Sequence, residues 1–346
     1  MKVFGIHDGR PIHEVALAAD DGRIAAAIIE YGAAVRDLQV QAKDGRMQRV
    51  VLGLASLDDY VAHSPHMGAI AGRFANRIRG GSFVLDGRRF QLPRNQDGKH
   101  CLHGGGRTGF GKSPWTVLHS DRRSVTLAHH SPDGCNGFPG ALTATCRYAL
   151  VPPATLRIEI WATTDAPTIV NLCHHSYFNL DGSADILDHT LQVHADNMTP
   201  VDGDLIPTGA VRAVAGTPYD FRAPRPVRRL GEDGKRFAYD SSYMLRREQS
   251  QESAATGLMI AHAATVGSAK SGLVMEVWTT EPACQIYDGA KVNVPVPGLG
   301  GVVYGPNAGI CLEPQHVPDS PNLPDFPSTV LRPGDVYRQA SEYRFT

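Results

Sequence analysis

Six short segments of the chain carry polar and ionisable side chains where a plain β protein would place apolar ones. The segments are residues 72–78, 99–105, 171–180, 237–243, 282–287 and 309–315. They include histidines, whose pKa of about 6.5 lets them exchange protons near neutrality, and acidic residues, whose carboxylates accept protons. These residue types are suited to general acid–base chemistry. Glu313 follows an apolar run and precedes Pro314, so its spacing is equally consistent with a site carboxylate and a solvated strand end.

A glycine-rich stretch imitates a nucleotide-binding loop. Residues 106–113 fit the phosphate-loop pattern G-x-x-x-x-G-K-[ST], and residues 104–109 fit the dinucleotide pattern G-x-G-x-x-G. Both patterns bind phosphate only when a hydrophobic strand leads into the loop and a helix N-terminus follows it. Here the preceding residues are largely polar, and residues 114–118 read as a strand. We therefore expect no nucleotide binding.

The histidines and cysteines are not arranged as metal ligands. His174 and His175 are adjacent in a segment that reads as extended, so their side chains should point to opposite faces. The sequence has no H-E-x-x-H motif and no Cys/His pair at ligand spacing. The six cysteines are spread singly, which indicates reduced and mostly buried thiols rather than a disulfide framework. We expect no metal site.

The elements that must position the polar segments read as short antiparallel strands. Asp-Gly pairs, which supply the positive φ angles of hairpin turns, recur at residues 21–22, 44–45, 86–87, 133–134, 181–182, 202–203 and 288–289. Period-two alternation appears around several of them and through residues 142–150, 156–160, 191–193 and 274–278. Residues 24–35 contain Gly32 and β-branched pairs, so they favour two strands over a helix. The pattern predicts an all-β sandwich or barrel.

Length and charge exclude several function classes. The chain has 346 residues, with 34 Lys+Arg against 35 Asp+Glu and a net charge of -1. This balance lacks the basic excess of a nucleic-acid or membrane-surface binder, and no apolar run is long enough to cross a membrane. With no clear linker or repeat, residues 1–346 are predicted to form one domain. The N-terminus lacks a signal-peptide core, so we expect a cytoplasmic protein.

Several motifs, taken together and in order, resemble the aldose 1-epimerase (galactose mutarotase) family over nearly the whole chain. They are Gly72-Arg-Phe-Ala-Asn-Arg-Ile78, His103-Gly-Gly, His175-Ser-Tyr-Phe-Asn-Leu180, Gly216-Thr-Pro-Tyr-Asp-Phe-Arg222, Leu312-Glu313 and Leu331-Arg-Pro-Gly334. The combination of H-S-Y-F-N-L with the late L-E is specific, although each motif alone would be weak. The glycine-rich stretch has a counterpart in the same family.

The resemblance implies a large antiparallel β-sandwich with an open cleft for a free sugar and no cofactor. Glu313 would be the catalytic base and His175 the catalytic acid. The residues implied as sugar-binding are Asn76, Arg77, His103, Asp240 and Gln285, with Ser176 and Tyr177 beside the acid. Arg73 belongs to the same motif as Asn76 and is a weaker candidate for a sugar contact.

This chemistry opens the hemiacetal ring of an aldose, rotates the chain about C1–C2 and recloses it. A base takes the proton of the C1 hydroxyl while an acid protonates the ring oxygen. With an ordinary pKa of about 4.3, Glu313 is expected to be ionised at neutral pH without assistance. Carboxylates near His175, such as Glu313 or Asp240, are expected to favour its protonated form.

Three positions depart from the family pattern, and two other functions stay open. His174, Ser241 and Pro314 stand where Asn, His and Thr are common in the family, which puts sugar preference in doubt. A glycoside hydrolase would need two carboxyl groups, for which Asp240 and Glu313 are the available pair. A non-catalytic sugar-binding domain on the same scaffold would not need both an acid and a base. The expected partner is a small free sugar, and the chain could be a monomer or homodimer.

Overall fold

The computed structural model describes residues 1–231, 233–248, 250–253 and 256–346. The regular structure is dominated by β-strands, which pair antiparallel in the large sheets. Among the described residues no helix is long and apolar enough to cross a membrane. The prediction of an all-β, antiparallel protein is confirmed.

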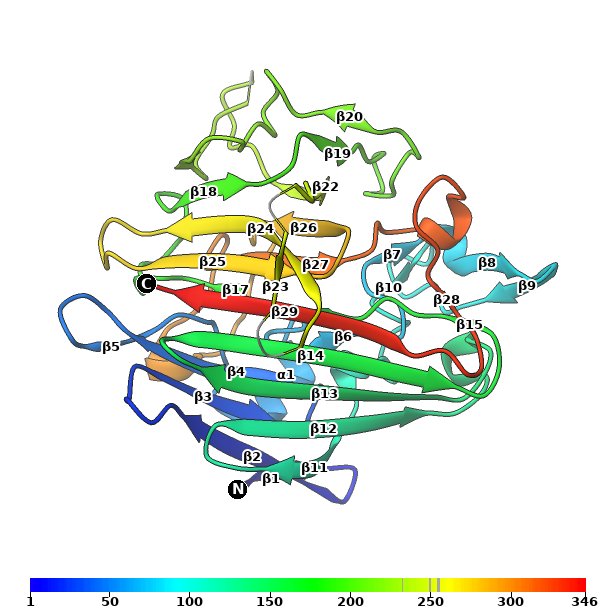
Figure 1. Cartoon of the computed structure of the whole chain (residues 1–346), viewed down its shortest axis with the longest axis horizontal. Coiled ribbons are helices and arrows are strands. Elements are labelled where there is room, and N and C mark those ends of the chain that lie inside the picture. The colour runs from blue at the N-terminus through cyan, green and yellow to red at the C-terminus, as the bar shows by residue number, and fades with distance from the viewer. Residues whose placement is uncertain (232, 249, 254–255) are drawn as a thin grey trace.

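The longest strands form one large sheet that faces the viewer in Figure 1. Its order is β11 (Thr116–Ser120), β12 (Ser124–Ser131), β13 (Leu142–Val151), β14 (Thr155–Thr164), β29 (Tyr337–Phe345), β25 (Val274–Thr279), β24 (Met259–Gly267), β18 (Thr190–Val193) and β21 (Arg225–Pro226). Strand β23 (Gln251–Glu252) pairs with β24 at its side. The alternating stretches seen in the sequence are β13, β14, β18 and β25.

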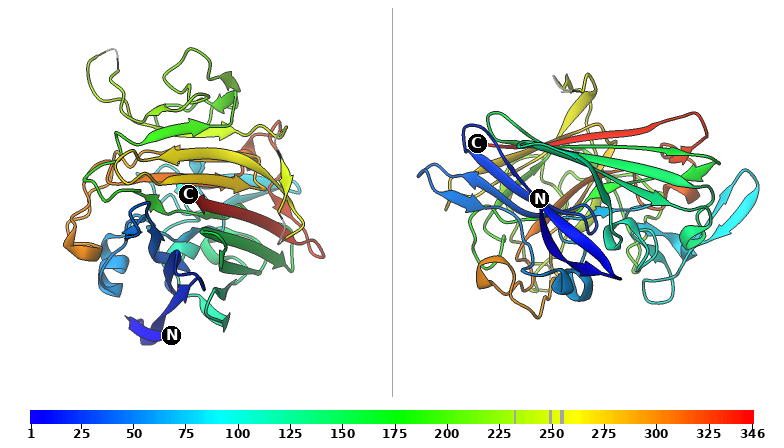
Figure 2. Two further views of the ribbon diagram at one scale, coloured as in Figure 1. Left: turned by 60° about the vertical axis from the view of Figure 1, so that its left-hand side comes forward. Right: turned by 90° about the horizontal axis from the view of Figure 1, so that it is seen from below.

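A second sheet lies behind the large one and contains several of the predicted site residues. Its order is β17 (Tyr177–Phe178), β27 (Ile310–Gln315), β26 (Ala283–Tyr287), β22 (Asp240–Met244), β19 (Asn197–Thr199) and β20 (Arg212–Ala213). The right-hand view of Figure 2 shows the long strands as one layer with most of the other elements beneath it. In the second sheet, Gln285 of β26 lies directly opposite Glu313 of β27.

The N-terminal strands make a third sheet, and short ladders complete the fold. The third sheet runs β1 (Lys2–His7), β2 (Arg10–Ala18), β3 (Ile24–Ile29), β4 (Ala34–Gln41) and β5 (Met47–Arg49). The short pairs are β10 (Cys101–Leu102) with β7 (Arg77–Ile78), β16 (Cys173–His174) with β6 (Ile70–Ala71), β15 (Thr168–Ile169) with β28 (Val330–Leu331), and β8 (Ser82–Leu85) with β9 (Arg88–Gln91). Helical turns are α1 (Leu57–His63), η1 (Arg79–Gly81), η2 (Phe110–Lys112), η3 (Cys135–Gly137), η4 (Leu299–Gly301) and η5 (Ser320–Asn322).

The predicted turns are partly confirmed. Asp86 and Gly87 join β8 to β9 with φ angles of 48° and 76°, as a two-residue hairpin requires. Residues 24–35 do form a strand pair, β3 and β4. The Asp181–Gly182 pair is a wrong hairpin prediction, because it lies between β17 and β18, which belong to different sheets. Asp-Gly reports a local turn, whereas sheet pairing depends on more distant contacts.

The principal core lies between the layers. Its buried side chains come from β2, β3 and β4 of the N-terminal sheet, from the large sheet, and from β26 and β27 of the second sheet. Because one contiguous apolar cluster joins all three sheets, burial of apolar area holds the polar segments in place. The six cysteines are free, and all but Cys135 are buried. This agrees with the structural interpretation of the single cysteines.

Candidate functional site

One cleft of about 370 Å³ brings together most of the residues singled out in the sequence. Its volume lies within the range of small-molecule sites. Of the predicted site residues it is lined by Asn76, Arg77, His103, His175, Tyr177, Asp240 and Glu313. The lining also includes Ser64, Pro65, His66, Leu102, Lys112, Tyr287 and Lys291.

Glu313 and His175 form a buried pair in this cleft. Glu313 projects from the central strand β27, and His175 lies between the short strands β16 and β17. Their Oε1 and Nε2 atoms are 3.5 Å apart, and only 2% of the Glu313 surface and 5% of the His175 surface is exposed. The Cys173 thiol lies 3.6 Å from Glu313 Oε2, and Cys311 Sγ lies 3.6 Å from His175 Nδ1. A bound molecule would therefore meet both groups at once.

Burial sets the protonation state of this pair. It raises the pKa of Glu313 to about 8, with the negative charge of Asp240 acting in the same direction. It lowers the pKa of His175 to about 4, and this effect outweighs the opposite influence of Asp240. The upward shift of the Glu313 pKa runs against the expectation of an ionised Glu313 at neutral pH, whereas Asp240 favours the protonated form of His175 in the expected direction. The neutral pair nevertheless carries the same single proton as the corresponding ion pair.

Asp240, at the start of β22, is held by donors on two sides. Arg77 Nη2 lies 3.6 Å from Asp240 Oδ2, and Gln285 Nε2 donates a hydrogen bond to Asp240 Oδ1. The guanidinium is fixed in turn, because its Nε donates to Gln96 Oε1 at 2.9 Å. Asn76, at a positive φ of 60°, accepts from the Arg77 backbone at 2.9 Å through Oδ1. This network presents a charged and rigid set of hydrogen-bonding groups to the cleft.

His103 is oriented by the backbone of Asn76. The His103 backbone N–H donates to the Asn76 carbonyl at 2.9 Å, and the Asn76 N–H donates to His103 Nδ1 at 3.2 Å. Because Nδ1 accepts, the ring proton sits on Nε2. Burial and the neighbouring histidines hold the pKa of His103 well below its ordinary value. His103 is thus a neutral hydrogen-bonding residue.

The segment around His175 alternates as an extended chain does. His175 and Tyr177 line the cleft, whereas His174 packs against Tyr148 and Tyr343 with ring centroids 6.0 and 5.7 Å away. Ser176 is buried with His174 away from the lining, and its hydroxyl has no hydrogen-bond partner among the described residues. A sugar contact by Ser176 finds no support in this geometry. Opposite orientations of His174 and His175 were expected, and the structure confirms them.

Two further predicted residues act at a distance from the cleft. Gln285 is buried outside the lining and reaches the site through its hydrogen bond to Asp240. Arg73 is also buried, at 1% exposure. Its guanidinium donates to the carbonyls of Gly140 and Ser131 at 2.8 and 3.2 Å, and to Ser131 Oγ at 2.7 Å. Arg73 therefore holds residues 131 and 140 together and lies outside the lining of the cleft.

A group of possible metal ligands lies within the same site. The ligand atoms of His175, Cys311 and Glu313 lie within 4.8 Å of one another. However, His175 uses Nε2 toward Glu313 and Nδ1 toward Cys311, and one imidazole cannot offer both nitrogens to one ion. Burial also keeps the pKa of the Cys311 thiol well above its ordinary value. The donor set therefore does not fit a metal centre.

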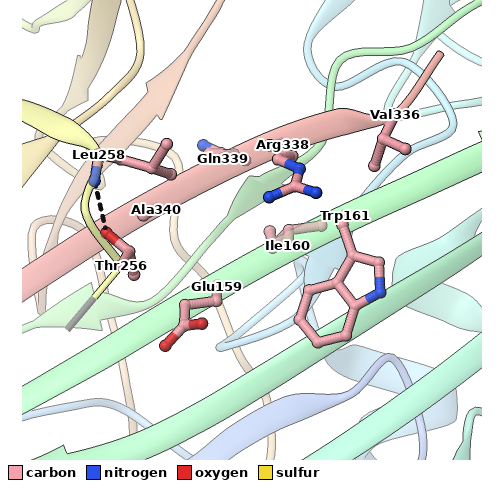
Figure 3. A pocket seen from close by; sticks show the side chains of 9 residues that line it. All are labelled: Glu159, Ile160, Trp161, Thr256, Leu258, Val336, Arg338, Gln339 and Ala340. Atoms are coloured by element: carbon pink, nitrogen blue, oxygen red, sulfur yellow. Dashed lines mark hydrogen bonds between the residues drawn. The ribbon is translucent and has the colours of Figure 1, made fainter.

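A second concavity, also of about 370 Å³, lies on the outer face of β14 and β29 (Figure 3). Glu159 and Trp161 project from β14, and Arg338 projects from β29 beside them. The Glu159 carboxylate lies 3.7 Å from Arg147 and 3.8 Å from Arg157, so it is paired within the sheet. The described lining of this concavity contains no histidine. Neither Glu313 nor His175 lines it.

Comparison with known proteins places this geometry in context. The family model described as aldose 1-epimerase matches residues 15–344. A galactose mutarotase of Mus musculus is 37% identical over 342 residues, covering 98% of this chain and 95% of the relative. An aldose 1-epimerase of Escherichia coli K12 is 36% identical over 345 residues, covering 98% and 96%. The solved structure of a GalM/aldose epimerase homologue from C. elegans has a TM-score of 0.88 at 29% identity, covering 97% and 99%.

Proposed function

Since this chain belongs to the aldose 1-epimerase family, we propose that it interconverts the α and β anomers of free aldoses such as galactose or glucose. The observation that carries the proposal is the Glu313–His175 pair at 3.5 Å on the floor of a cleft lined by hydrogen-bonding side chains. Glu313 acts as the base and His175 as the acid in ring opening. Asn76, Arg77, His103 and Asp240 bind the sugar hydroxyls.

The reaction needs one proton removed and one delivered on neighbouring atoms. In ring opening, the Glu313 carboxylate takes the proton of the C1 hydroxyl as the His175 imidazolium protonates the ring oxygen. The C1–ring oxygen bond breaks, and C1 becomes an aldehyde carbon. After rotation about C1–C2, the C5 hydroxyl attacks the other face of the aldehyde. It gives its proton to His175, while Glu313 returns a proton to the carbonyl oxygen.

The proton count of the pair suits this cycle. The sugar gives up and receives one proton in each half-reaction, so the pair alternates between the ion pair and the neutral pair without exchange with solvent. The neutral form, which burial favours in the free cleft, is also the form that accompanies the open-chain aldehyde. The buried environment therefore favours the protonation state of the intermediate, in which positive and negative charge have both been discharged.

Polarimetry of freshly dissolved α-D-galactose and α-D-glucose tests the proposal. We expect the protein to speed the approach to an unchanged final rotation for at least one of the two sugars. Glu313→Gln and His175→Ala should each lose most of this acceleration while the circular dichroism of the fold is retained. Near-normal turnover in either variant would refute the assigned roles. Release of reducing sugar from an aryl glycoside would favour a hydrolase built on Asp240 and Glu313.

A further inference from the structure

One wall of the cleft carries a histidine that the proposed chemistry does not use. His66 lines the cleft, and its ring centroid lies 4.7 Å from that of His103 and 6.1 Å from that of His175. Its backbone has a positive φ of 66°, a conformation that side-chain-bearing residues adopt at a cost. Such strain persists only where the surroundings impose it, and it concentrates at functional sites.

The backbone conformation of His66 is held by contacts from residues 106–113, the stretch that matches the phosphate-loop pattern. Lys112 Nζ donates a hydrogen bond to the carbonyl of Ser64, two residues before His66. A Cβ on Gly111 would lie 2.7 Å from His66 Nδ1, closer than real contacts allow. Gly111 does not have a positive φ, so this position needs the missing side chain rather than backbone freedom. The glycine and lysine of the motif thus seat the His66 segment.

The same segment is tied to the proposed acid. The Gly68 N–H donates to the His175 carbonyl at 3.0 Å, and the His175 N–H donates to the Ala69 carbonyl at 2.9 Å. The Tyr177 hydroxyl donates to the Pro65 carbonyl at 3.1 Å. His66 is therefore fixed in position relative to the reacting groups. A residue that discriminates between substrates needs such a fixed position.

The charge state and orientation of His66 suit a neutral hydroxyl. Burial, together with Lys112 and His175, holds the pKa of His66 well below its ordinary value, so the ring is uncharged at neutral pH. Nδ1 is buried against Gly111 and has no hydrogen-bond partner among the described residues. This leaves Nε2 as the nitrogen available to a bound molecule. An uncharged imidazole can donate to or accept from a hydroxyl.

We propose that His66 is a specificity-determining residue of the cleft, binding one hydroxyl group of the aldose through Nε2. The inference rests on the proposed mutarotase function and adds a sugar contact on the wall built by Ser64, Gly111 and Lys112. Aldoses that differ in configuration at the contacted carbon are discriminated, because only one epimer places its hydroxyl within reach of a ring held in this position.

The first test replaces His66 by phenylalanine, which keeps a ring of similar size and removes both nitrogens. Loss of one neutral hydrogen bond should raise KM about 3- to 10-fold for the preferred aldose, with a smaller rise for an epimer lacking that contact. The kcat should change by less than about two-fold because Glu313 and His175 are untouched. His66→Gln, which restores an amide near Nε2, should recover part of the loss in KM. A KM within about two-fold of wild type for galactose, glucose and pentoses would overturn the proposal. So would a lower kcat at unchanged KM.

A second variant tests whether Gly111 positions the His66 ring, and it leaves the proposed sugar-binding side chains unchanged. Gly111→Ala should displace His66 and raise KM in the same direction, whereas Gly305→Ala should not, since a Cβ there meets nothing within 4 Å. In the double variant His66→Phe with Gly111→Ala, the two effects should not add. Additive effects would overturn the proposed seat. A wild-type protein inactive on every aldose would refute the proposed function itself, whereas an active wild type matched by His66→Phe would refute only this inference.

Discussion

Replacing the proposed base should make the free protein more stable at neutral pH. The pKa of Glu313 is raised from 4.5 to about 8, so the folded chain holds a proton that the unfolded chain has lost at pH 7. Proton binding by Glu313 therefore favours the folded state at low pH. The free energy of unfolding falls as the pH rises from about 4.5 toward about 8, because the unfolded chain then ionises this carboxyl group more readily than the folded chain does. At 1.36 kcal/mol per pKa unit, this loss amounts to about 3 kcal/mol at pH 7 and about 1 kcal/mol at pH 5.

Glu313→Gln cannot ionise and so escapes this loss. The amide oxygen can keep the hydrogen bond from Gln315 Nε2, which is 3.4 Å long in the wild type, and the amide group can donate to the neutral His175 ring. Urea unfolding at pH 5 and pH 7 should show a stability advantage of the variant that grows by about 2 kcal/mol between the two values.

The difference between the two proteins isolates this one carboxyl group. Titration of His175 is common to both proteins, so its direct contribution cancels in the comparison. Replacing the exposed Glu252 by Gln provides a control that should show no comparable pH dependence. A stability difference that does not change with pH, or a Glu313→Gln variant less stable than wild type at pH 7, would refute the reasoning.

Three further outcomes follow from the site. The pH profile of kcat/KM should be bell-shaped, with an acid limb near the His175 pKa of about 4 and an alkaline limb near the Glu313 pKa of about 8. The reason is that the pair must carry one proton in total to be active. A flat profile between pH 6 and 9 would contradict this. Cys173→Ser should move the alkaline limb of this profile to lower pH, because a hydroxyl stabilises the Glu313 carboxylate better than the thiol that lies 3.6 Å from Oε2. An alkaline limb at the wild-type pH would argue against a contact between residue 173 and Glu313. Arg73→Met should lower the free energy of unfolding by at least about 3 kcal/mol in urea titrations, because several buried carbonyls lose their donor. The KM should stay within about two-fold of wild type. A large change in KM with little loss of stability would instead identify Arg73 as a sugar contact.

The strands were predictable because alternation and turn residues are local signals. Residues 156–160 alternate between aliphatic and charged side chains, and the structure places them in β14. The same alternation also bears on one site prediction. If His174 and His175 face opposite sides, then Ser176 must turn with His174, away from the cleft. The family resemblance implied a sugar-binding role for Ser176 together with Tyr177 because both adjoin His175 in the motif.

The protonation of the site could not be predicted, because burial is a tertiary property. From its residue type Glu313 has an ordinary carboxyl pKa, and only the closed packing around β27 favours its uncharged form at neutral pH. The wall that bears His66 was missed for a related reason. Its residues lie more than 40 positions from Gly111 and Lys112, and the contact between the two segments appears only in the folded chain.

The single cysteines illustrate how an ordinary structural residue can serve a site without reacting in it. Cys173 and Cys311 flank the Glu313–His175 pair, and burial holds the pKa of both thiols well above the ordinary value, so they stay uncharged. A thiol fills the space beside a carboxylate while donating only weakly to it. A hydroxyl at position 173 would stabilise the ionised Glu313 and so favour the ion-pair state. The weakly donating thiol instead leaves the neutral pair favoured, and this is the protonation state that accompanies the open-chain aldehyde in the proposed cycle.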